Sequence, residues 1–473
     1  MKRILLNRLL GGVLILFPCM AHVQTITQEA FLEQLISSHP LFEKESMTSQ
    51  IYEQEQSSYR GTEDWNVFAS LNVSHEEPMI AIAGPEQTDA ISVGAGVDRL
   101  IWATGGRLSA SVNSSHATIE LDPMFGFPES FYMNQVNLSY SQPLLKNWKG
   151  YLNRLQYNLK QYDIDFSDVQ AKENIENFLK VSAAKFLDWV FLSEQKTIAA
   201  DRLKLSKEEL DRTKRKRSAN LVDQADVIRA EDAVRFWRQR LVLAESQWKA
   251  LQAELSILAQ DKEILDAAPE FDLYQTGNLG SLEDATNQLK NQSRLLKVLK
   301  IRLDQLQVAR AGYEETAKSD LSLITQFNIK KYDEDLARSL GMDKPDALIG
   351  LQYAFPVQNR TAKHQVEKTQ IQISQLQKQQ EEIVLTLTSA LSNIHIQIRE
   401  MDQVLSLNRE QIQSARDRTE EELKLYNQGR GDLTFVILSR DNEENAKLTY
   451  AANALTYHKL NLEYLALMDQ LYE

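Results

Sequence analysis

The sequence predicts a mainly helical protein in which a smaller set of strands forms part of a membrane β-barrel. Three observations predict this fold class: an N-terminal segment typical of secretory signal peptides, two very long stretches with helical periodicity, and short segments that alternate apolar and polar side chains. Glycine (17) and proline (10) are scarce among the 473 residues and gather in a few places. Long uninterrupted elements are therefore expected between those places.

Residues 1–21 are predicted to be a cleaved signal peptide. Three basic residues precede the apolar run 9–17, and small residues surround Ala21, where cleavage is expected. The alternative is a lipoprotein signal in which Cys19 is acylated. The bulky and cyclic residues directly before Cys19 disfavour that alternative.

Charge and cysteine content exclude several classes of function. The chain carries 53 basic and 66 acidic residues, and the leader holds three basic and no acidic ones, so the net charge expected after cleavage is −16. Nucleic acid is therefore not an expected partner. Cys19 is the only cysteine, so a cleaved chain forms neither a disulfide nor a thiolate metal site. Beyond the leader, no apolar run reaches the roughly 18 to 20 residues of a membrane helix, so strands are the expected means of crossing a membrane.

Two stretches are predicted to be exceptionally long helices. In 150–217 and 360–427, apolar residues return every three to four positions with no internal proline or glycine after Gly150. At 1.5 Å per residue, each helix would be about 100 Å long. Shorter helices are predicted over 27–60, 221–260, 281–317 and 433–471.

Six segments alternate with a period of two and are predicted to be strands. Four lie in the first half of the chain and two in the second, at 65–74, 91–98, 108–113, 136–141, 321–329 and 349–355. One face of each is apolar and the other small and polar, as in a barrel with lipid outside and water inside. A half-buried sheet of a soluble protein is the alternative, because it alternates in the same way. Aromatic residues near strand ends are candidates for the membrane interface: Trp65, Trp102, Tyr132, Tyr140 and Tyr353.

The order of elements predicts an internal two-fold repeat. Pro143 and Pro356 each end the last strand before a very long helix, 213 residues apart, and are candidates for the bends between barrel and helix. The predicted organisation is a first repeat at 22–260 (strands 65–142, helical hairpin 148–260), a connector at 261–280, and a second repeat at 281–473 (strands 320–356, hairpin 357–473).

Two turns between helices carry the most specific motifs. One is Ser-Ala-Asn-Leu-Val-Asp-Gln-Ala-Asp-Val at 218–227, and the other is Asn-Gln-Gly-Arg-Gly-Asp-Leu-Thr-Phe at 427–435. Asn220 and Gly429, 209 residues apart, are residue types that tolerate a left-handed backbone. The first turn resembles the Gly-x-x-Ser-x-x-Asp-Val-Leu-x-Ala turn of the TolC-like outer-membrane factor family, with Asn220 in the glycine place. Together with 26–31 and 142–146, these segments resemble that family across nearly the whole chain after the leader.

The resemblance implies a homotrimer in the outer membrane, with a shared β-barrel, a long periplasmic α-barrel and no enzymatic activity. It implies the channel component of a tripartite efflux or type I secretion system, working with a periplasmic adaptor and an inner-membrane pump. The family's best-known members contribute four strands per subunit. Six strands are predicted here, so either the barrel is larger or the hairpin around 102–107 lies outside it.

The resemblance also places the adaptor contact and the gate at the two turns. The family's aspartate rings fall at positions that hold Phe435 and Leu438 in this chain. Nearby aspartates could form carboxylate rings in a trimer, or could simply cap helices, and Phe435 could form an apolar constriction. The candidate residues are Asn220, Leu221, Asp223, Asp226, Gly429, Arg430, Gly431, Asp432, Phe435 and Leu438.

No catalytic, cofactor or metal site is expected from the sequence. The seven histidines show no ligand spacing, and no nucleophile, phosphate-binding or paired-carboxylate motif is evident. An exported periplasmic coiled-coil scaffold is the alternative to a channel, because it would explain the helices but not the six strands.

Overall fold

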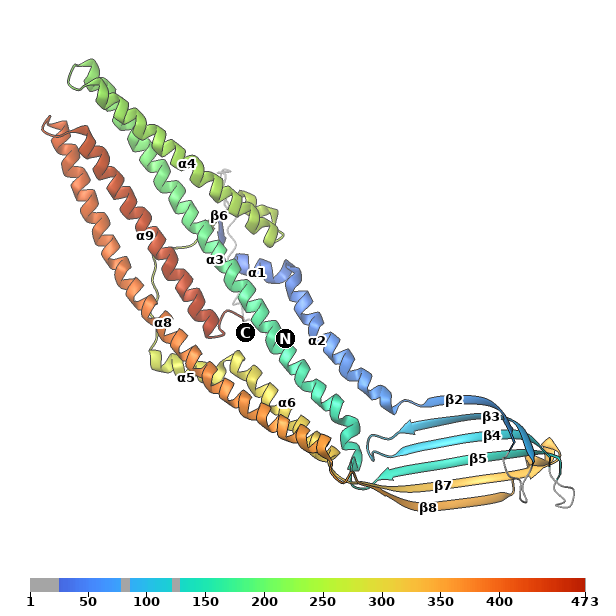
Figure 1. The fold of residues 1–473 in the computed structure, drawn as a ribbon. Helices are drawn as coiled ribbons and strands as arrows, with labels where there is room; N and C mark the ends of the chain where they lie inside the picture. The colour runs from blue at the N-terminus through green and yellow to red at the C-terminus, as the bar shows by residue number, and fades with distance from the viewer. Residues whose placement is uncertain (1–24, 78–85, 121–127, 473) are drawn as a thin grey trace, which may run out of the picture. The chain divides into compact units, whose positions relative to one another are not determined.

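The computed structural model describes residues 25–77, 86–120 and 128–472 of the chain (Figure 1). The predicted signal peptide and Cys19 lie outside the described residues. The chain forms two compact units, each assembled from separated segments. The first contains Met1–Phe42, Glu176–Leu282 and Leu391–Leu471, and the second contains Glu43–Ile175, Glu283–Ala390 and Tyr472–Glu473. The predicted boundaries of the sequence repeats stay a prediction.

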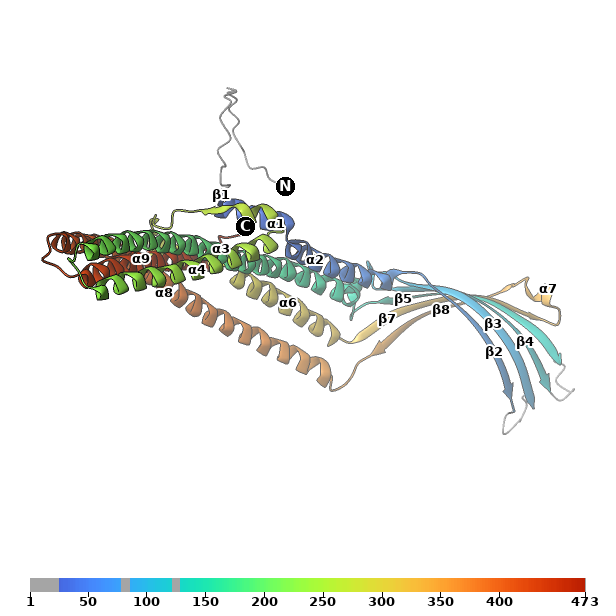
Figure 2. The ribbon, with the colours of Figure 1, turned by 90° about the horizontal axis from the view of Figure 1, so that it is seen from above.

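The second unit contains a six-stranded antiparallel sheet. Its strands are β2 (Asn66–Glu76), β3 (Gln87–Leu100), β4 (Arg107–Glu120), β5 (Ser130–Pro143), β7 (Asp320–Asp333) and β8 (Lys344–Ala354). Neighbours in sequence are neighbours in the sheet, so the order is β2-β3-β4-β5-β7-β8. All six predicted strands are confirmed. The hairpin around 102–107 joins β3 to β4 within the sheet, and the strands curve together along their length (Figure 2).

Register gives this sheet one apolar and one polar face. Val67 pairs with Val97, Ala95 with Val112, and every pairing matches residues whose side chains point the same way. The apolar alternation of each strand therefore merges into one face, while serine, asparagine, glutamine and glycine dominate the other. The apolar face is largely uncovered, since Val73 is 74% exposed and Ile349 is 79% exposed.

Helices of the second unit adjoin the sheet at the end where β5 and β8 finish. They include α2 (Pro40–Ser58), α6 (Arg294–Thr316), and the parts of α3 (Tyr151–Ser218) and α8 (Arg360–Asn427) that belong to this unit. Polar contacts join them: Gln56 Nε2 donates to the Tyr157 carbonyl oxygen at 3.2 Å, and Arg302 Nη1 donates to Asp163 Oδ1 at 3.0 Å.

The first unit is built from two helical hairpins. The remainder of α3 pairs with α4 (Gln224–Leu258), and the remainder of α8 pairs with α9 (Leu433–Leu467), as Figure 1 shows. The long helices are 68 residues each and the shorter partners 35 residues each. Their buried core gathers aromatic and aliphatic side chains from distant segments, among them Phe31, Phe186, Trp189, Leu255, Leu405 and Tyr457.

The connector 261–280 is packed into this unit. It contains the short helix η4 (Lys262–Asp266) and the strand β6 (Ala268–Glu270), which pairs in parallel with β1 (Thr25–Thr27). Ile264 and Leu273 are buried in the core, and Gln252 Nε2 donates to the carbonyl oxygens of Ile264 and Ala267 at 2.8 and 2.9 Å. The pairing of β1 with β6 has no signal in the periodicity of either segment, because three residues are too few to show one.

Two predicted helices are each divided in the structure. The predicted helix 27–60 forms α1 (Gln28–Ser38) and α2, because Pro40 disfavours a helical backbone at His39, which is extended. The predicted helix 281–317 forms α5 (Leu282–Gln292) and α6, divided at the N-cap Ser293. Smaller elements complete the fold: η1 (Tyr59–Glu63), η3 (Trp148–Gly150) and α7 (Leu336–Ser339). No helix among the described residues is long and apolar enough to span a membrane.

Gly150 allows a close approach at the junction between β5 and α3. Its φ is +67°, and a Cβ at this position would overlap the carbonyl oxygen of Trp102. We expect Gly150→Ala to lower the free energy of unfolding by at least about 2 kcal/mol, from backbone strain and steric overlap. Thermal unfolding of the detergent-solubilised protein, followed by circular dichroism, measures this. Gly277→Ala is the control, because a Cβ there meets nothing within 4 Å; equal melting temperatures for the two variants would contradict the prediction.

Candidate functional site at the helical turns

Both helical hairpins close with the same hydrogen-bonded turn. In the first, Leu221 N donates to the Lys216 carbonyl at 2.9 Å and Asn220 N to the Arg217 carbonyl at 3.0 Å. This is a Schellman motif with Asn220 in the left-handed region at φ +58°. The second turn repeats it: Arg430 N donates to the Leu425 carbonyl at 3.0 Å, and Gly429 N to the Tyr426 carbonyl at 3.2 Å.

Glycine is needed at 429 for its backbone conformation and not for space. Its φ is +75°, yet a Cβ would meet nothing within 4 Å. Gly431 differs, because a Cβ there would crowd the backbone of Tyr426 and Leu425 at 2.9 and 3.1 Å. The left-handed backbone expected at Asn220 and Gly429 is therefore present at both.

The aspartates of the turns start the helices that follow them. Asp432 is the N-cap of α9, and its Oδ1 accepts from Thr434 N at 2.7 Å; these bonds hold the pKa of Asp432 below its usual value. Asp223 is the N-cap of α4, and its backbone N–H donates to Asp226 Oδ2 at 3.3 Å. Asp226 also pairs with Arg229 at 2.8 Å. Helix capping accounts for the contacts of all three aspartates in the isolated chain.

The two turns pack against one another within the first unit. Ala230, Tyr426, Leu433 and Val436 form a small buried cluster. Lys216 Nζ lies 3.4 Å from the centre of the Tyr426 ring and donates to the Tyr426 carbonyl oxygen at 3.1 Å. Burial is the main cause of the lowered pKa of Lys216, and the nearby Arg212 adds to it.

Apolar side chains remain exposed around this packed turn. Leu221, Phe435 and Leu438 project outward, and Phe435 is 53% exposed. Leu438 helps to line a groove of about 380 Å³ between α4 and α9, to which Phe236, Trp237 and Ile437 also contribute. In the isolated chain Phe435 and Leu438 are therefore free to contact another surface, whether a second subunit or a different protein.

A buried ionic cluster connects the hairpins along their length. Arg202 of α3 is fully buried, and its Nη2 and Nε atoms donate to Asp441 Oδ1 of α9 at 2.9 and 3.1 Å. Its Nη1 donates to Glu209 Oε2 at 3.4 Å, and Trp237 Nε1 of α4 donates to Asp441 Oδ1 at 3.2 Å. Arg440 Nε lies 2.8 Å from Glu209 Oε1, an ion pair without hydrogen-bond alignment.

Sequence reasoning missed this cluster, although one signal was present. Arg202, Ser206 and Glu209 recur at helical spacing on one face of α3, so a charged and polar line crosses a face that is otherwise buried. Burial raises the pKa of Glu209, and the two arginines oppose that rise.

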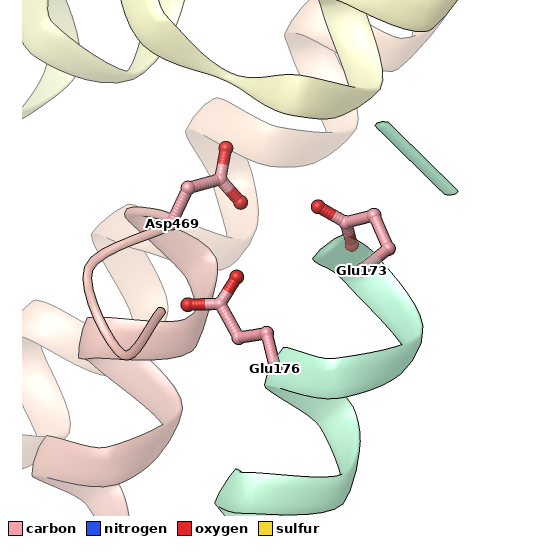
Figure 3. A group of neighbouring side chains, drawn as sticks. All are labelled: Glu173, Glu176 and Asp469. Atoms are coloured by element: carbon pink, nitrogen blue, oxygen red, sulfur yellow. The ribbon is translucent and has the colours of Figure 1, made fainter. Parts of the chain in front are cut away.

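Two carboxylates also lie close together in the first unit. Figure 3 shows the side chains of Glu176, on α3, and Asp469, just after α9, with ligand atoms within 4.8 Å of one another. Glu176 is buried, and its Oε1 accepts from the Leu471 backbone N–H at 2.8 Å. This bond ties the chain after α9 to α3, which is a structural role.

The predicted interface aromatics divide into two groups. Trp65 and Tyr353 are exposed, and Tyr140 lies on the same apolar face at the same end of the sheet. Tyr132 lies on that face eight residues earlier in β5, beside the His116 ring. Trp102 differs: it is only 8% exposed, its Nε1 donates to Thr62 Oγ1 at 2.8 Å and its ring packs against Tyr157, so within this chain it is an internal anchor.

The bend candidates end their strands, but other residues make the turn into α3. Pro143 is the last residue of β5, and Pro356 follows β8. After Pro143, the left-handed residues Asn147, Lys149 and Gly150 redirect the chain. Asn147 Oδ1 then accepts from Leu152 N at 2.8 Å at the start of α3.

Solved structures of bacterial channels share this fold. The outer-membrane channel OprN matches with a TM-score of 0.68 at 11% identity, covering 94% of this chain and 90% of that one. VceC, an outer membrane protein of Vibrio cholerae, matches with a TM-score of 0.67 at 9% identity, covering 93% and 96%. The Campylobacter jejuni CmeC outer membrane channel matches with a TM-score of 0.65 at 12% identity, covering 94% and 86%. No protein-family model and no curated protein sequence matches the chain.

The chain therefore has the fold of outer-membrane efflux channels. The resemblance to TolC-like outer-membrane factors, which rests on the order of weak motifs, is confirmed at the level of the fold.

The buried ionic cluster generates a prediction for stability. Glu209→Gln removes the carboxylate shared by two buried guanidinium groups, so we expect the free energy of unfolding to fall by about 3–5 kcal/mol. The exposed neighbour Glu208 provides the matched control, because Glu208→Gln removes the same charge from a solvated position. Thermal unfolding in one detergent compares the two variants. If both melt together, the cluster does not hold the hairpins.

Proposed function

We propose that this chain is a subunit of a homotrimeric outer-membrane channel that serves as a passive conduit for solutes or proteins. The observation that carries the proposal is the six-stranded sheet with one exposed apolar face and one polar face. A soluble protein buries such a face, because exposing it costs about 25 cal/mol per Å² of apolar surface. Lipid contact on the apolar face and water on the other satisfy both surfaces.

The dimensions of the sheet support a membrane role. Tyr132 and Tyr140 lie on one strand, eight residues apart, which is about 26 Å along the strand. With a strand tilt of about 40°, this separation corresponds to about 20 Å of height, close to the ~25 Å apolar band of outer-membrane barrels. Aromatic residues at both borders suit the two water–lipid interfaces.

We further propose that the helical hairpins continue the conduit through the periplasm and that the turns at 218–226 and 427–435 are its inner end. The exposed Phe435 and Leu438 and the groove between α4 and α9 support contact with a helical adaptor protein. An inner-membrane pump acting through that adaptor would then supply the solute. Transport through the channel involves no chemical step.

An exported coiled-coil scaffold is the second candidate. The long helical hairpins favour it, but the exposed apolar sheet face has no use in such a protein.

Fractionation and conductance separate these two functions. The channel is expected in the outer-membrane fraction, as a detergent-extracted trimer by native mass spectrometry, and to give ion conductance in planar lipid bilayers. A scaffold would remain in the soluble fraction. A soluble, non-conducting protein would overturn the proposal.

A pair of substitutions at Gly429 tests the turn as the inner end. Gly429→Val is expected to abolish export, because a β-branched residue disfavours the left-handed backbone by about 1–2 kcal/mol and deforms the turn. Gly429→Asn should retain export, since asparagine already occupies the equivalent place at 220. Trimer yield is measured in parallel. Unchanged export with Gly429→Val would remove this turn from the docking site.

A further inference from the structure

The six-stranded sheet has two open edges. Among the described residues, β2 pairs only with β3, and β8 pairs only with β7, so one side of each outer strand carries backbone N–H and C=O groups without a strand partner. The two strands lie at opposite edges (Figure 1) and are each 11 residues long. In lipid, every one of those groups would need a hydrogen-bond partner.

The edges lack the features that protect edge strands in soluble proteins. Such strands are short, or carry lysine and proline that discourage pairing. β2 has neither residue along its length, and every one of its residues is exposed. β8 has Lys344 and Pro345, but only at its first two positions, where a missing N–H affects the end of the strand.

We propose that β2 of one copy pairs antiparallel with β8 of the next copy, so that three copies close a wall of eighteen strands. The number of copies rests on the proposed homotrimer. An even number of strands per chain makes this closure possible, because β2 and β8 then run in opposite directions when all copies stand the same way up. The two edges differ from each other, so the contact is head-to-tail and forms a closed ring.

The side chains select the register of this seam. If Asn66 lies opposite Ala354, then Glu76 lies opposite Lys344, and the seam is in contact along all of both strands with opposite charges paired at its far end. In this register Leu71 faces Ile349, so the apolar residues of β2 and β8 fall on the same side. A shift by one residue would place them on opposite sides.

The consequence is a wall wider than that of a channel with four strands per subunit. For a spacing of about 4.8 Å and a tilt of about 40°, eighteen strands give a diameter of about 36 Å between backbone walls, against about 24 Å for twelve. The hairpin of β3 and β4 belongs to the wall, because both of its strands pair with neighbours along their length.

Paired cysteines test the seam in the full-length protein extracted from membranes. Leu71→Cys combined with Ile349→Cys places two thiols directly opposite, within the 4.4–6.8 Å Cα separation that a disulfide requires. Oxidation is expected to give linked dimers and trimers on non-reducing gels, and reduction should return them to monomers. The protein without added cysteines accounts for the native Cys19.

Two control pairs fix the register. Leu71→Cys with Tyr353→Cys is displaced by four residues, about 13 Å along the strand, and Leu71→Cys with Gly350→Cys points to opposite faces. Neither is expected to link. Intact trimers without a link from the 71/349 pair would overturn the seam while leaving the channel in place, whereas a monomeric protein would overturn the proposed function itself.

The place of the β3–β4 hairpin is tested separately. A bimane fluorophore on Val112→Cys should be quenched by brominated lipid, while the same probe on Ser111→Cys, on the opposite face of β4, should not. Quenching at neither position would place the hairpin outside the wall and reduce the ring to twelve strands.

Discussion

The register of the antiparallel sheet is the constraint on which the rest of this structure depends. Side chains alternate along each strand, so six alternating strands make one apolar face only if every pairing preserves the parity of the alternation. All five pairings do so. One slipped strand would bring apolar side chains into the polar face and polar ones into the apolar face. The proposed separation of lipid from water therefore comes from strand pairing, more than from any single residue.

The helical unit solves a different problem, which is how to hold long, polar helices together. The two long helices are 68 residues each, with much of their surface exposed. Packing is concentrated in an aromatic core around Phe186 and Trp189 and in a small cluster at the turns. Between them lies the buried cluster of Arg202, Glu209 and Asp441, which is satisfied only when α3 and α9 are in one alignment. Buried charges that lose their partners are costly, so this cluster specifies alignment as much as it adds stability.

The turns combine conformational rigidity with an exposed apolar surface. Schellman hydrogen bonds and N-capping aspartates satisfy the backbone at each turn, so the turns need no partner to be stable. Phe435 and Leu438 nevertheless remain exposed. A surface that is stable alone and still apolar is suited to binding that is made and broken, which is what docking to an adaptor requires.

Local features were determined by the sequence alone. Periodicity predicted all six strands and both long helices, because apolar spacing reports directly on local backbone geometry. Residue type predicted the left-handed positions at Asn220 and Gly429, because few residues tolerate that conformation. Only the tertiary structure decided which distant segments meet. It paired all six strands in one sheet, turned Trp102 inward against Thr62 and Tyr157, and brought Arg202 to Asp441. Such contacts join residues as far as 239 positions apart, and no local pattern in either segment specifies the partner, since the free energy of the contact exists only after the chain has folded.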